Sequence, residues 1–516
     1  MVKQKVLKNE KNMEEQLWDA ANKLRGTVES SQYKHVVLGL IFLKFASDKF
    51  EDRRKELIAE GKDKYLEMKE FYNMKNVFFL PPESRWSHVQ NNAKQDDIAL
   101  IVDTALHTIE KNNPSLKGAL PDNYFSRLNL DPSKLAALLD TINNINTTDK
   151  EEDVVGRIYE YFLGRFAAAE GKGGGEFYTP KCIVNLIAEM LEPYKGKIYD
   201  PCCGSGGMFV QSLDFVKNHS GNTKEISIYG QEFTSVTYKL AKMNLAIRGI
   251  SGNLGEVPAN TFFKDQHPDL KADYIMANPP FNQSQWREKN ELEDDPRWNG
   301  YPTPPTGNAN YAWIMHMLSK LSEHGTAGFV LANGSMSTNT SGEGEIRQQM
   351  IENDLVDCMI ALPGQLFYTT QIPVCLWFMT KNKKEDSVHG YRNREDETLF
   401  IDARNMGTMI DRTQKELTDD DIAEITRTYH AWRGEEKDGD YEDIAGYCKS
   451  ASLEEIKAND YVLTPGRYVG IEEEEDDGIH FEDRMTELTE TLKSQMAESE
   501  QLDAEIRENL KVLGYE

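Results

Sequence analysis

The 516-residue sequence lacks the features that mark several other classes of protein. Its longest apolar run, Val36–Phe45, is interrupted by Lys44 and is too short to cross a bilayer. Residues 1–11 are charged and contain no apolar stretch of the kind found in secretory signals. Six cysteines without C-x-x-C spacing indicate neither a disulfide framework nor a metal site. We therefore expect a cytoplasmic protein with no membrane span and no bound metal.

Basic residues are also scarce, because 59 lysines and arginines face 86 acidic residues and leave a net charge of −27. Residues 1–150 hold 23 basic and 22 acidic side chains, residues 151–380 hold 18 and 27, and residues 381–516 hold 18 and 37. Tight autonomous binding of DNA depends on Lys and Arg displacing counterions from phosphates. If this chain acts on nucleic acid, we expect a partner to hold the duplex, although an acidic excess also serves solubility alone.

The length predicts at least two domains, since one hydrophobic core rarely grows beyond about 250–300 residues. Apolar residues recur at helical spacing from Glu14 to Phe50, and Asp131–Leu139 opens with an Asp-Pro helix start. We therefore expect a mainly α-helical N-terminal domain over residues 1–150, connected through the polar stretch 143–150 to a second domain over residues 151–470.

The second domain alternates short β-rich runs with helical segments, which is typical of an α/β fold with a doubly wound, Rossmann-like parallel sheet. We expect helices at Ile183–Leu191, Met208–Phe215 and Thr234–Arg248. The expected strands are Ile198–Asp200, Ile226–Glu232, Tyr274–Ala277, Gly328–Asn333, Val356–Leu362 and Val374–Thr380.

After Thr380 the sequence becomes polar, and we expect irregular structure there. Residues 471–516 are expected to form an acidic linker, with six consecutive acids at Glu472–Asp477, and a C-terminal helix. That helix packs either on its own domain or against a partner helix. Its apolar stripe follows a 3-4 spacing through Met485, Leu488, Leu492, Leu502, Ile506 and Leu513, with Gln495, Ser499 and Asn509 as polar interruptions.

A glycine-rich turn, Asp200–Gly207, lies between the first expected strand and the next helix, where glycines let a backbone approach a ligand. Phe209 replaces the third glycine of G-x-G-x-x-G, and Gly171–Gly175 lacks G-K-[ST], so a nicotinamide or a nucleoside triphosphate is disfavoured. Glu232 follows Gly206 by 26 residues, the spacing of an acid that binds ribose hydroxyls. Together these features predict a cofactor that contains adenosine.

The tetrapeptide Asn278-Pro279-Pro280-Phe281 ends the strand Tyr274–Ala277, and two prolines stiffen the loop that follows. A planar exocyclic amine is a poor nucleophile because its lone pair is conjugated to the ring. The Asn278 side-chain oxygen and the Pro279 carbonyl can accept its two hydrogens and free that lone pair, while Phe281 stacks on the ring. The alternative is an ordinary turn after a strand.

With Gly174–Pro180 upstream, these motifs resemble those of the N6-adenine DNA methyltransferases. Over roughly residues 10–516 the chain resembles the modification subunit of Type I restriction–modification systems. The resemblance implies a site-specific, adenine-specific DNA methyltransferase that transfers a methyl group from S-adenosylmethionine (AdoMet) to a flipped adenine held by Asn278, Pro279, Pro280 and Phe281. It implies that AdoMet contacts Glu176, Phe177, Tyr178, Thr179, Pro180 and Lys181, the turn residues Asp200, Gly204, Ser205, Gly206 and Gly207, Glu232 at the ribose, and Asp265 near the adenine.

The resemblance also implies partners, namely double-stranded DNA, a separate specificity subunit that binds two copies of this chain, and an endonuclease subunit. Two rival functions fit the same residues: methylation of RNA adenines or protein glutamines, and a non-catalytic subunit that binds AdoMet to sense it. Phe281 in place of tyrosine and the large helical first domain favour DNA, and the intact Asn278–Phe281 favours an enzyme.

Residues 282–310 are too many for a simple connection. They contain Trp286, Arg287, Trp298 and Tyr301. The segment is expected to be either a loop that closes over flipped DNA or a disordered insertion.

Overall fold

The computed structural model describes residues 17–19, 22, 30–144, 154–170, 179–219, 221–367, 371–471 and 481–512. The chain divides into two compact units, one ending at Gly470 and the other beginning at Ile471. Among the residues in these ranges, no helix has both the length and the apolar character that crossing a membrane requires.

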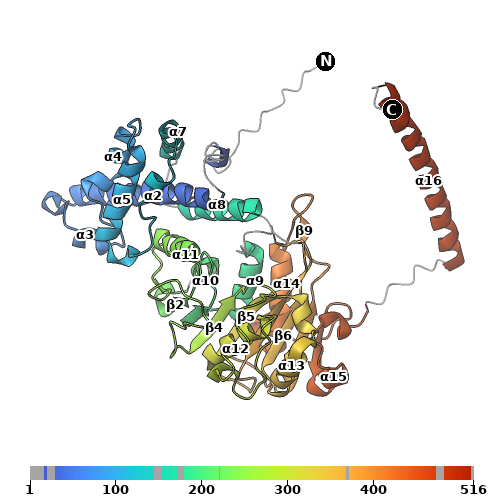
Figure 1. Ribbon diagram of the computed structural model, residues 1–516. Coiled ribbons are helices and arrows are strands. Elements are labelled where there is room, and N and C mark those ends of the chain that lie inside the picture. The colour runs from blue at the N-terminus through green and yellow to red at the C-terminus, as the bar shows by residue number, and fades with distance from the viewer. Residues whose placement is uncertain are drawn as a thin grey trace. The chain divides into compact units, whose positions relative to one another are not determined.

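The N-terminal part of the first unit is helical, as expected, and its core is built around the long helix α2 (Ser30–Ala59) (Figure 1). The Asp-Pro signal begins α7 (Pro132–Asn143), where the Asp131 carboxylate accepts a hydrogen bond from the backbone N–H of Ser133. Further helices of this part are α3 (Glu70–Asn73), α4 (Trp86–Asn91), α5 (Ile98–Asn112), α6 (Tyr124–Arg127) and α8 (Val154–Glu170).

A nine-stranded sheet follows, with the strand order β11-β8-β6-β7-β5-β4-β1-β2-β3. The strands are β1 (Gly196–Asp200), β2 (Ile226–Gly230), β3 (Gly252–Asn253), β4 (Ala272–Ala277), β5 (Leu321–Ala332), β6 (Val356–Ala361), β7 (Val374–Thr380), β8 (Glu397–Asp402) and β11 (Cys448–Ser452). Each of the six expected strands is present, so the expected α/β, doubly wound fold is confirmed.

The sheet is mixed, however, and the expectation of a wholly parallel sheet is wrong. Strand β7 runs antiparallel to both of its neighbours, β5 and β6, and β11 runs antiparallel to β8. All seven residues of β7 are buried and nearly all are apolar, which is the pattern of a central parallel strand. An apolar sequence pattern indicates that a strand is buried, but it does not indicate whether the strand runs parallel or antiparallel to its neighbours.

Helices cover both faces of the sheet (Figure 1). One face packs against α9 (Lys181–Leu191), α10 (Gly207–Asn218), α11 (Ser235–Ile247) and α14 (Asp419–Arg433). The other packs against α12 (Asn310–Lys320), α13 (Glu343–Glu352) and α15 (Leu453–Ala458). The carboxyl ends of β1, β2 and β4 meet at one edge, which carries the motifs singled out in the sequence.

The expectation of irregular structure after Thr380 is wrong. That region supplies β8, α14, β11 and α15, together with a small hairpin, β9 (Thr408–Met409) and β10 (Lys415–Glu416). Tyr429 and Trp432 of α14 are fully buried against the sheet. The sequence around these two residues is strongly acidic because the outer face of α14 is exposed to solvent. The few buried residues of the helix therefore do not produce a clear apolar pattern.

Helix α8 packs on α2, so the helical core continues beyond residue 150. It also contacts α11, because the Tyr159 hydroxyl donates to the carbonyl of Leu240 at 3.1 Å and the Arg248 guanidinium pairs with Glu160 at 2.9 Å. Helix α11 therefore belongs to both cores, with one face on the sheet and another on the helical region.

The second unit contains the expected terminal helix, α16 (Phe481–Val512). Four residues of its apolar stripe, Met485, Leu492, Leu502 and Ile506, are each about half exposed. Leu513, the last residue of the expected stripe, lies outside the described residues.

Candidate active site

The Asn-Pro-Pro-Phe motif leaves the sheet directly after β4. The Asn278 amide N–H donates to the Thr179 hydroxyl at 2.9 Å, which ties together two residues that are 99 positions apart in the sequence. The Asn278 side-chain oxygen is buried and has no hydrogen-bond partner among the described residues. An orphan buried acceptor is costly, so its presence marks a place where a donor is expected to bind.

The rest of the motif shapes the same edge. Pro279 is buried and Pro280 is half-buried, which holds the loop against the sheet. The partly buried Phe281 ring meets the ring of Phe367 edge-on, with centroids 5.8 Å apart and an angle of 79° between the planes. Phe367 follows β6, so a second strand end supports the ring that the sequence predicts will stack on a base.

The glycine-rich turn joins β1 to α10 as expected. Gly204 and Gly206 have φ values of +52° and +80°, which favour glycine, and α10 begins at Gly207. A Cβ added at Gly204 or Gly207 meets no protein atom within 4 Å, so the turn borders open space. The Ser205 carbonyl accepts from the Asn244 side chain at 2.8 Å, which anchors the turn to α11.

Glu232 stands beside this turn, after β2. Its carboxylate accepts from the backbone N–H of Gly204 at 3.1 Å and from that of Thr234 at 2.7 Å. The structure therefore unites the turn and the acid that the sequence predicts will hold an adenosine ribose. Backbone glycine, open space and a nearby carboxylate together fit such a cofactor.

Asp200, at the end of β1, is fully buried beneath the turn. Burial raises the pKa of Asp200 to about 7, although the backbone N–H of Cys202 donates to its carboxylate at 3.0 Å. The negative charge of Glu232 acts in the same direction as burial. A cationic ligand at this place would favour the ionised carboxylate.

Asp265 lies further along the loop after β3, and its carboxylate already pairs with Lys320. Burial is the largest single influence and raises the pKa of Asp265, but the hydrogen bonds from Lys320 and the His267 backbone, with the positive charge of Lys320, together lower it below its ordinary value. The part of the loop next to Glu232 is Ala259, whose backbone N–H donates to the Glu232 carbonyl at 2.9 Å. The sequence analysis did not identify Ala259–Phe262 as part of the site, because only the fold places this stretch beside Glu232. The role of Asp265 near the cofactor's adenine stays a prediction.

The segment before α9 divides into two parts. Glu176, Phe177 and Tyr178 lie outside the described residues. Thr179 reaches Asn278, Pro180 caps α9, and Lys181 is its exposed first residue. Within the described part, this segment therefore contacts the Asn278–Phe281 loop through Thr179.

Residues 282–310 form a packed segment, so the expectation of a disordered insertion is wrong. Trp286 and Trp298 are 4% and 3% exposed, and their indole N–H groups donate to the carbonyls of Pro305 and Leu292. Arg287 donates only to carbonyls of the same segment. These aromatic and cationic groups are bound within the protein, so they do not form an open surface for flipped DNA.

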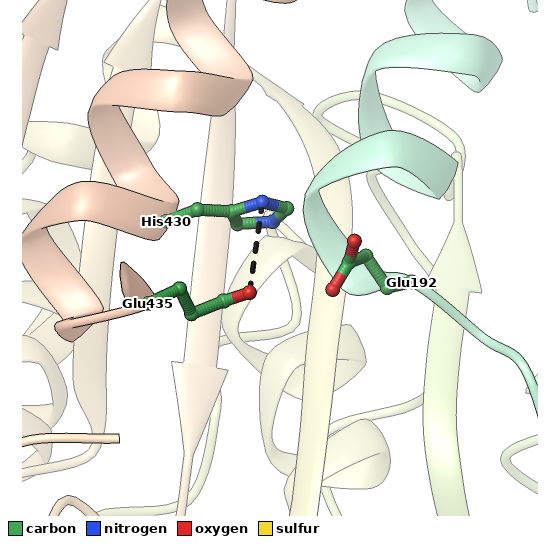
Figure 2. A group of neighbouring side chains, drawn as sticks. All are labelled: Glu192, His430 and Glu435. Carbon is green, nitrogen blue, oxygen red and sulfur yellow. Dashed lines mark ion pairs between the residues drawn. The ribbon is translucent and has the colours of Figure 1, made fainter. Parts of the chain in front are cut away.

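A separate cluster of titratable groups, Glu192, His430 and Glu435, lies where α9 and α14 end (Figure 2). It is the one group among the described residues that has the arrangement of metal ligands. The Lys437 ammonium is 2.6 Å from Glu192 and 3.4 Å from Glu435, and Arg433 also pairs with Glu435. These carboxylates are therefore neutralised by protein cations, and the cluster ties α9 to α14.

Comparison with known proteins agrees with this geometry. The family description "N-6 DNA Methylase" matches residues 150–477, and "HsdM N-terminal domain" matches residues 13–142. The methylase subunit of the Type I restriction enzyme HindI from Haemophilus influenzae is 50% identical over 85% of this chain and all of its own length. The MjaIX methylase subunit from Methanocaldococcus jannaschii is 41% identical over 97% of this chain and 91% of its own length.

Solved structures with a similar fold include a protein of the same kind. The crystal structure of a type I restriction–modification methyltransferase subunit from Streptococcus thermophilus superposes with a TM-score of 0.73 at 24% identity, covering 89% of this chain and 99% of that one. The glycine-rich turn, Glu232 and the Asn-Pro-Pro-Phe loop lie at one sheet edge, and close relatives match over most of the chain. The chain therefore belongs to the N-6 DNA methylase family, as a modification subunit of the Type I restriction–modification systems.

Proposed function

We propose that this chain methylates N6 of an adenine flipped out of double-stranded DNA, and that Asn278–Phe281 holds the flipped base. AdoMet is the methyl donor of the family. The observation that supports the proposed site is the buried side-chain oxygen of Asn278, which has no hydrogen-bond partner among the described residues. The proposed donor site is Asp200–Gly207 with Glu232, on the neighbouring strand ends.

The residues of the loop act on the amine in two ways. The Asn278 side-chain oxygen and the Pro279 carbonyl accept the two N6 hydrogens and favour a pyramidal nitrogen with a free lone pair. Thr179 holds the Asn278 amide, so its oxygen cannot rotate away. When bound, AdoMet would supply a methyl group on a positively charged sulfur that can leave as a neutral thioether. Asn278 and Pro279 would hold N6 with its lone pair free for that methyl group, and the proton that N6 gives up would pass to water.

Extrusion of the base costs a few kcal/mol, and stacking on one aromatic ring returns about 1–3 kcal/mol. Phe281 therefore cannot drive base flipping alone, and the grip on the duplex must supply the remainder. This balance agrees with an acidic chain that acts inside a larger complex. DNA as the substrate also supports a cytoplasmic location.

The site is tested by Asn278→Ala in the complex with its partner. Transfer of a tritiated methyl group to duplex DNA is expected to fall to near zero, while binding of AdoMet measured by calorimetry is retained. Asn290→Ala, an exposed asparagine in the following segment, is the matched control and is expected to keep full activity. Substantial turnover by Asn278→Ala, or transfer to RNA or protein in preference to DNA, would contradict the proposal.

We further propose that α16 binds the specificity subunit, with two copies of this chain in each complex and an endonuclease subunit joining them. The half-exposed apolar stripe supports this, because burial against partner helices would remove it from water. The relatives named above are subunits of Type I restriction enzymes, and a structural neighbour, at 19% identity and a TM-score of 0.58, comes from work on assembly of a type I complex.

Deleting residues 482–516 is expected to abolish co-purification with the specificity subunit while AdoMet binding is retained. Leu502→Lys with Ile506→Lys should have the same effect, because two charges enter the stripe. Glu500→Lys with Ala504→Lys places two lysines on the opposite face of the helix and should leave the complex intact. If the deletion variant still co-purifies, the contact lies elsewhere in the chain.

A further inference from the structure

Arg297, in the packed segment 282–310, has a partner for every donor it carries. Its guanidinium has five N–H groups. Two of them bind the Asp295 carboxylate, at 2.7 Å and 2.6 Å. The other three reach out of the segment, to the carbonyls of Thr261 and Phe262 at 3.3 Å and 2.6 Å and to Nδ1 of His316 at 3.2 Å. The side chain is 11% exposed, so these bonds are sheltered from water.

The two carbonyls belong to the stretch Ala259–Phe262, which adjoins the proposed cofactor site on two sides. The backbone N–H of Ala259 donates to the carbonyl of Glu232, the residue proposed to hold the ribose. The Thr261 hydroxyl donates to the carbonyl of Pro201 in the glycine-rich turn at 2.6 Å. The position of this stretch is therefore set from one side by the turn and from the other by Arg297.

His316 gives Arg297 a rigid support. The ring lies fully buried on α12, and burial together with the neighbouring Arg297 lowers its pKa to about 3, so it is neutral. Because a guanidinium can only donate, Nδ1 of His316 accepts from it, and the ring proton is on Nε2, which faces the Tyr199 hydroxyl at 3.0 Å. Tyr199 belongs to β1, so Arg297 is anchored to the central sheet through one hydrogen-bonded relay.

We propose that Arg297 is a positioning residue for the methyl donor: it fixes the Thr261 and Phe262 carbonyls and so holds Ala259–Phe262 in the shape that AdoMet binding requires. Segment 282–310, which follows the Asn278–Phe281 loop, thereby stabilises one wall of the proposed cofactor pocket. This inference rests on the proposed function, because it takes Glu232 and the glycine-rich turn as the AdoMet site.

The experiment measures the Kd for AdoMet of the full chain by calorimetry, without DNA. Arg297→Lys keeps the charge, but its three donors cannot serve five acceptors, and Kd is expected to rise about tenfold or more. Arg297→Ala should bind more weakly still, and millimolar guanidinium should restore part of its affinity. In the assembled complex, KM for AdoMet should rise by a similar factor while kcat changes less than KM.

Arg287→Lys is the matched control, because Arg287 lies in the same segment and donates only to carbonyls within it. Its Kd for AdoMet is expected to stay within about twofold of the wild type. If Arg297→Ala does not fold, Asp295→Asn removes the charge that orients the guanidinium and should give an intermediate rise in Kd. Equal Kd values for the wild type, Arg297→Lys and Asp295→Asn would overturn the inference, as would equal losses in Arg287→Lys and Arg297→Lys.

The same data separate this inference from the proposed function. A wild-type chain that binds AdoMet but methylates no DNA in its complex would overturn the proposed function and leave the role of Arg297 to be decided by Kd. A wild-type chain that does not bind AdoMet would overturn both.

Discussion

At the scale of single residues, the site contains groups that are unfavourable for folding until a ligand arrives. The buried oxygen of Asn278 lacks a donor among the described residues, and Asp200 is buried beside the negative Glu232. Such groups lower the stability of a protein without ligand, and they persist where the ligand compensates them. The two unfavourable groups sit at the proposed target and donor sites.

Asp200→Asn is expected to stabilise the chain at pH 8 in the absence of AdoMet. Burial raises the pKa of Asp200 in the folded state to about 7, above the ordinary value of 3.8 that the unfolded chain has. The folded state therefore binds the proton more tightly, so stability is greatest below pH 4 and is lost as pH rises to about 7. The difference of about three pH units corresponds to at most about 4 kcal/mol.

Urea unfolding at pH 5 and pH 8 measures this effect. The variant should exceed the wild-type chain in stability by less at pH 5, where the native carboxyl is protonated and only the unfolded one is ionised, than at pH 8, where both are ionised. A variant that is less stable than the wild type at pH 8 would show that the carboxylate is stabilised in the folded state. Adding AdoMet should reduce the advantage of the variant, since a cationic ligand favours the ionised group.

Sequence alone could identify the residues of the motifs but could not identify their partners. Asn278, Gly204 and Glu232 stand next to strands with clear apolar patterns, so their place at the sheet edge follows from local sequence. The hydrogen bond from Asn278 to Thr179 joins two segments that only the folded sheet brings together. The pairing of Asp265 with Lys320 and the link from Arg297 to Thr261 are non-local in the same way.

At the scale of elements, periodicity located strands and helices well where each was long and apolar. It failed for segments whose buried residues are few. Residues 282–310 contain no repeating apolar pattern, yet Trp286 and Trp298 anchor the segment in the core, with ring centroids 6.2 Å apart. Large aromatic side chains can order a stretch rich in proline and acid that has only a short 3-10 helix, Pro296–Trp298.

Trp298→Ala is therefore expected to destabilise the whole domain by about 3–5 kcal/mol, the cost of removing a buried tryptophan from a packed core. Tyr301→Phe, which removes only a hydroxyl that accepts from the exposed Asn353, is the control and should cost less than about 1 kcal/mol. Urea unfolding measures both variants. A disordered segment would give no loss for Trp298→Ala, and limited proteolysis of the free wild-type chain would then cut within residues 282–310.

At the scale of the whole molecule, the charge of the chain indicates that DNA binding depends mainly on its partner. The helical N-terminal region is nearly neutral, and the excess of acid rises along the sequence to 37 acidic against 18 basic side chains in residues 381–516. A negatively charged surface repels the phosphate backbone of DNA. The chain is therefore suited to modify a base that is presented to it and poorly suited to bind duplex DNA alone.

We therefore expect the chain alone to bind duplex DNA more weakly than about 100 μM at 150 mM salt, the weak end of non-specific binding. The complex with the specificity subunit should bind far more tightly, and the logarithm of its association constant should fall linearly with the logarithm of salt concentration because the partner contributes the phosphate contacts. Fluorescence anisotropy with a labelled duplex measures both species across a salt series. Tight, salt-dependent binding by the isolated chain would require a phosphate-binding surface on this subunit, and the grip that base flipping needs would then be its own.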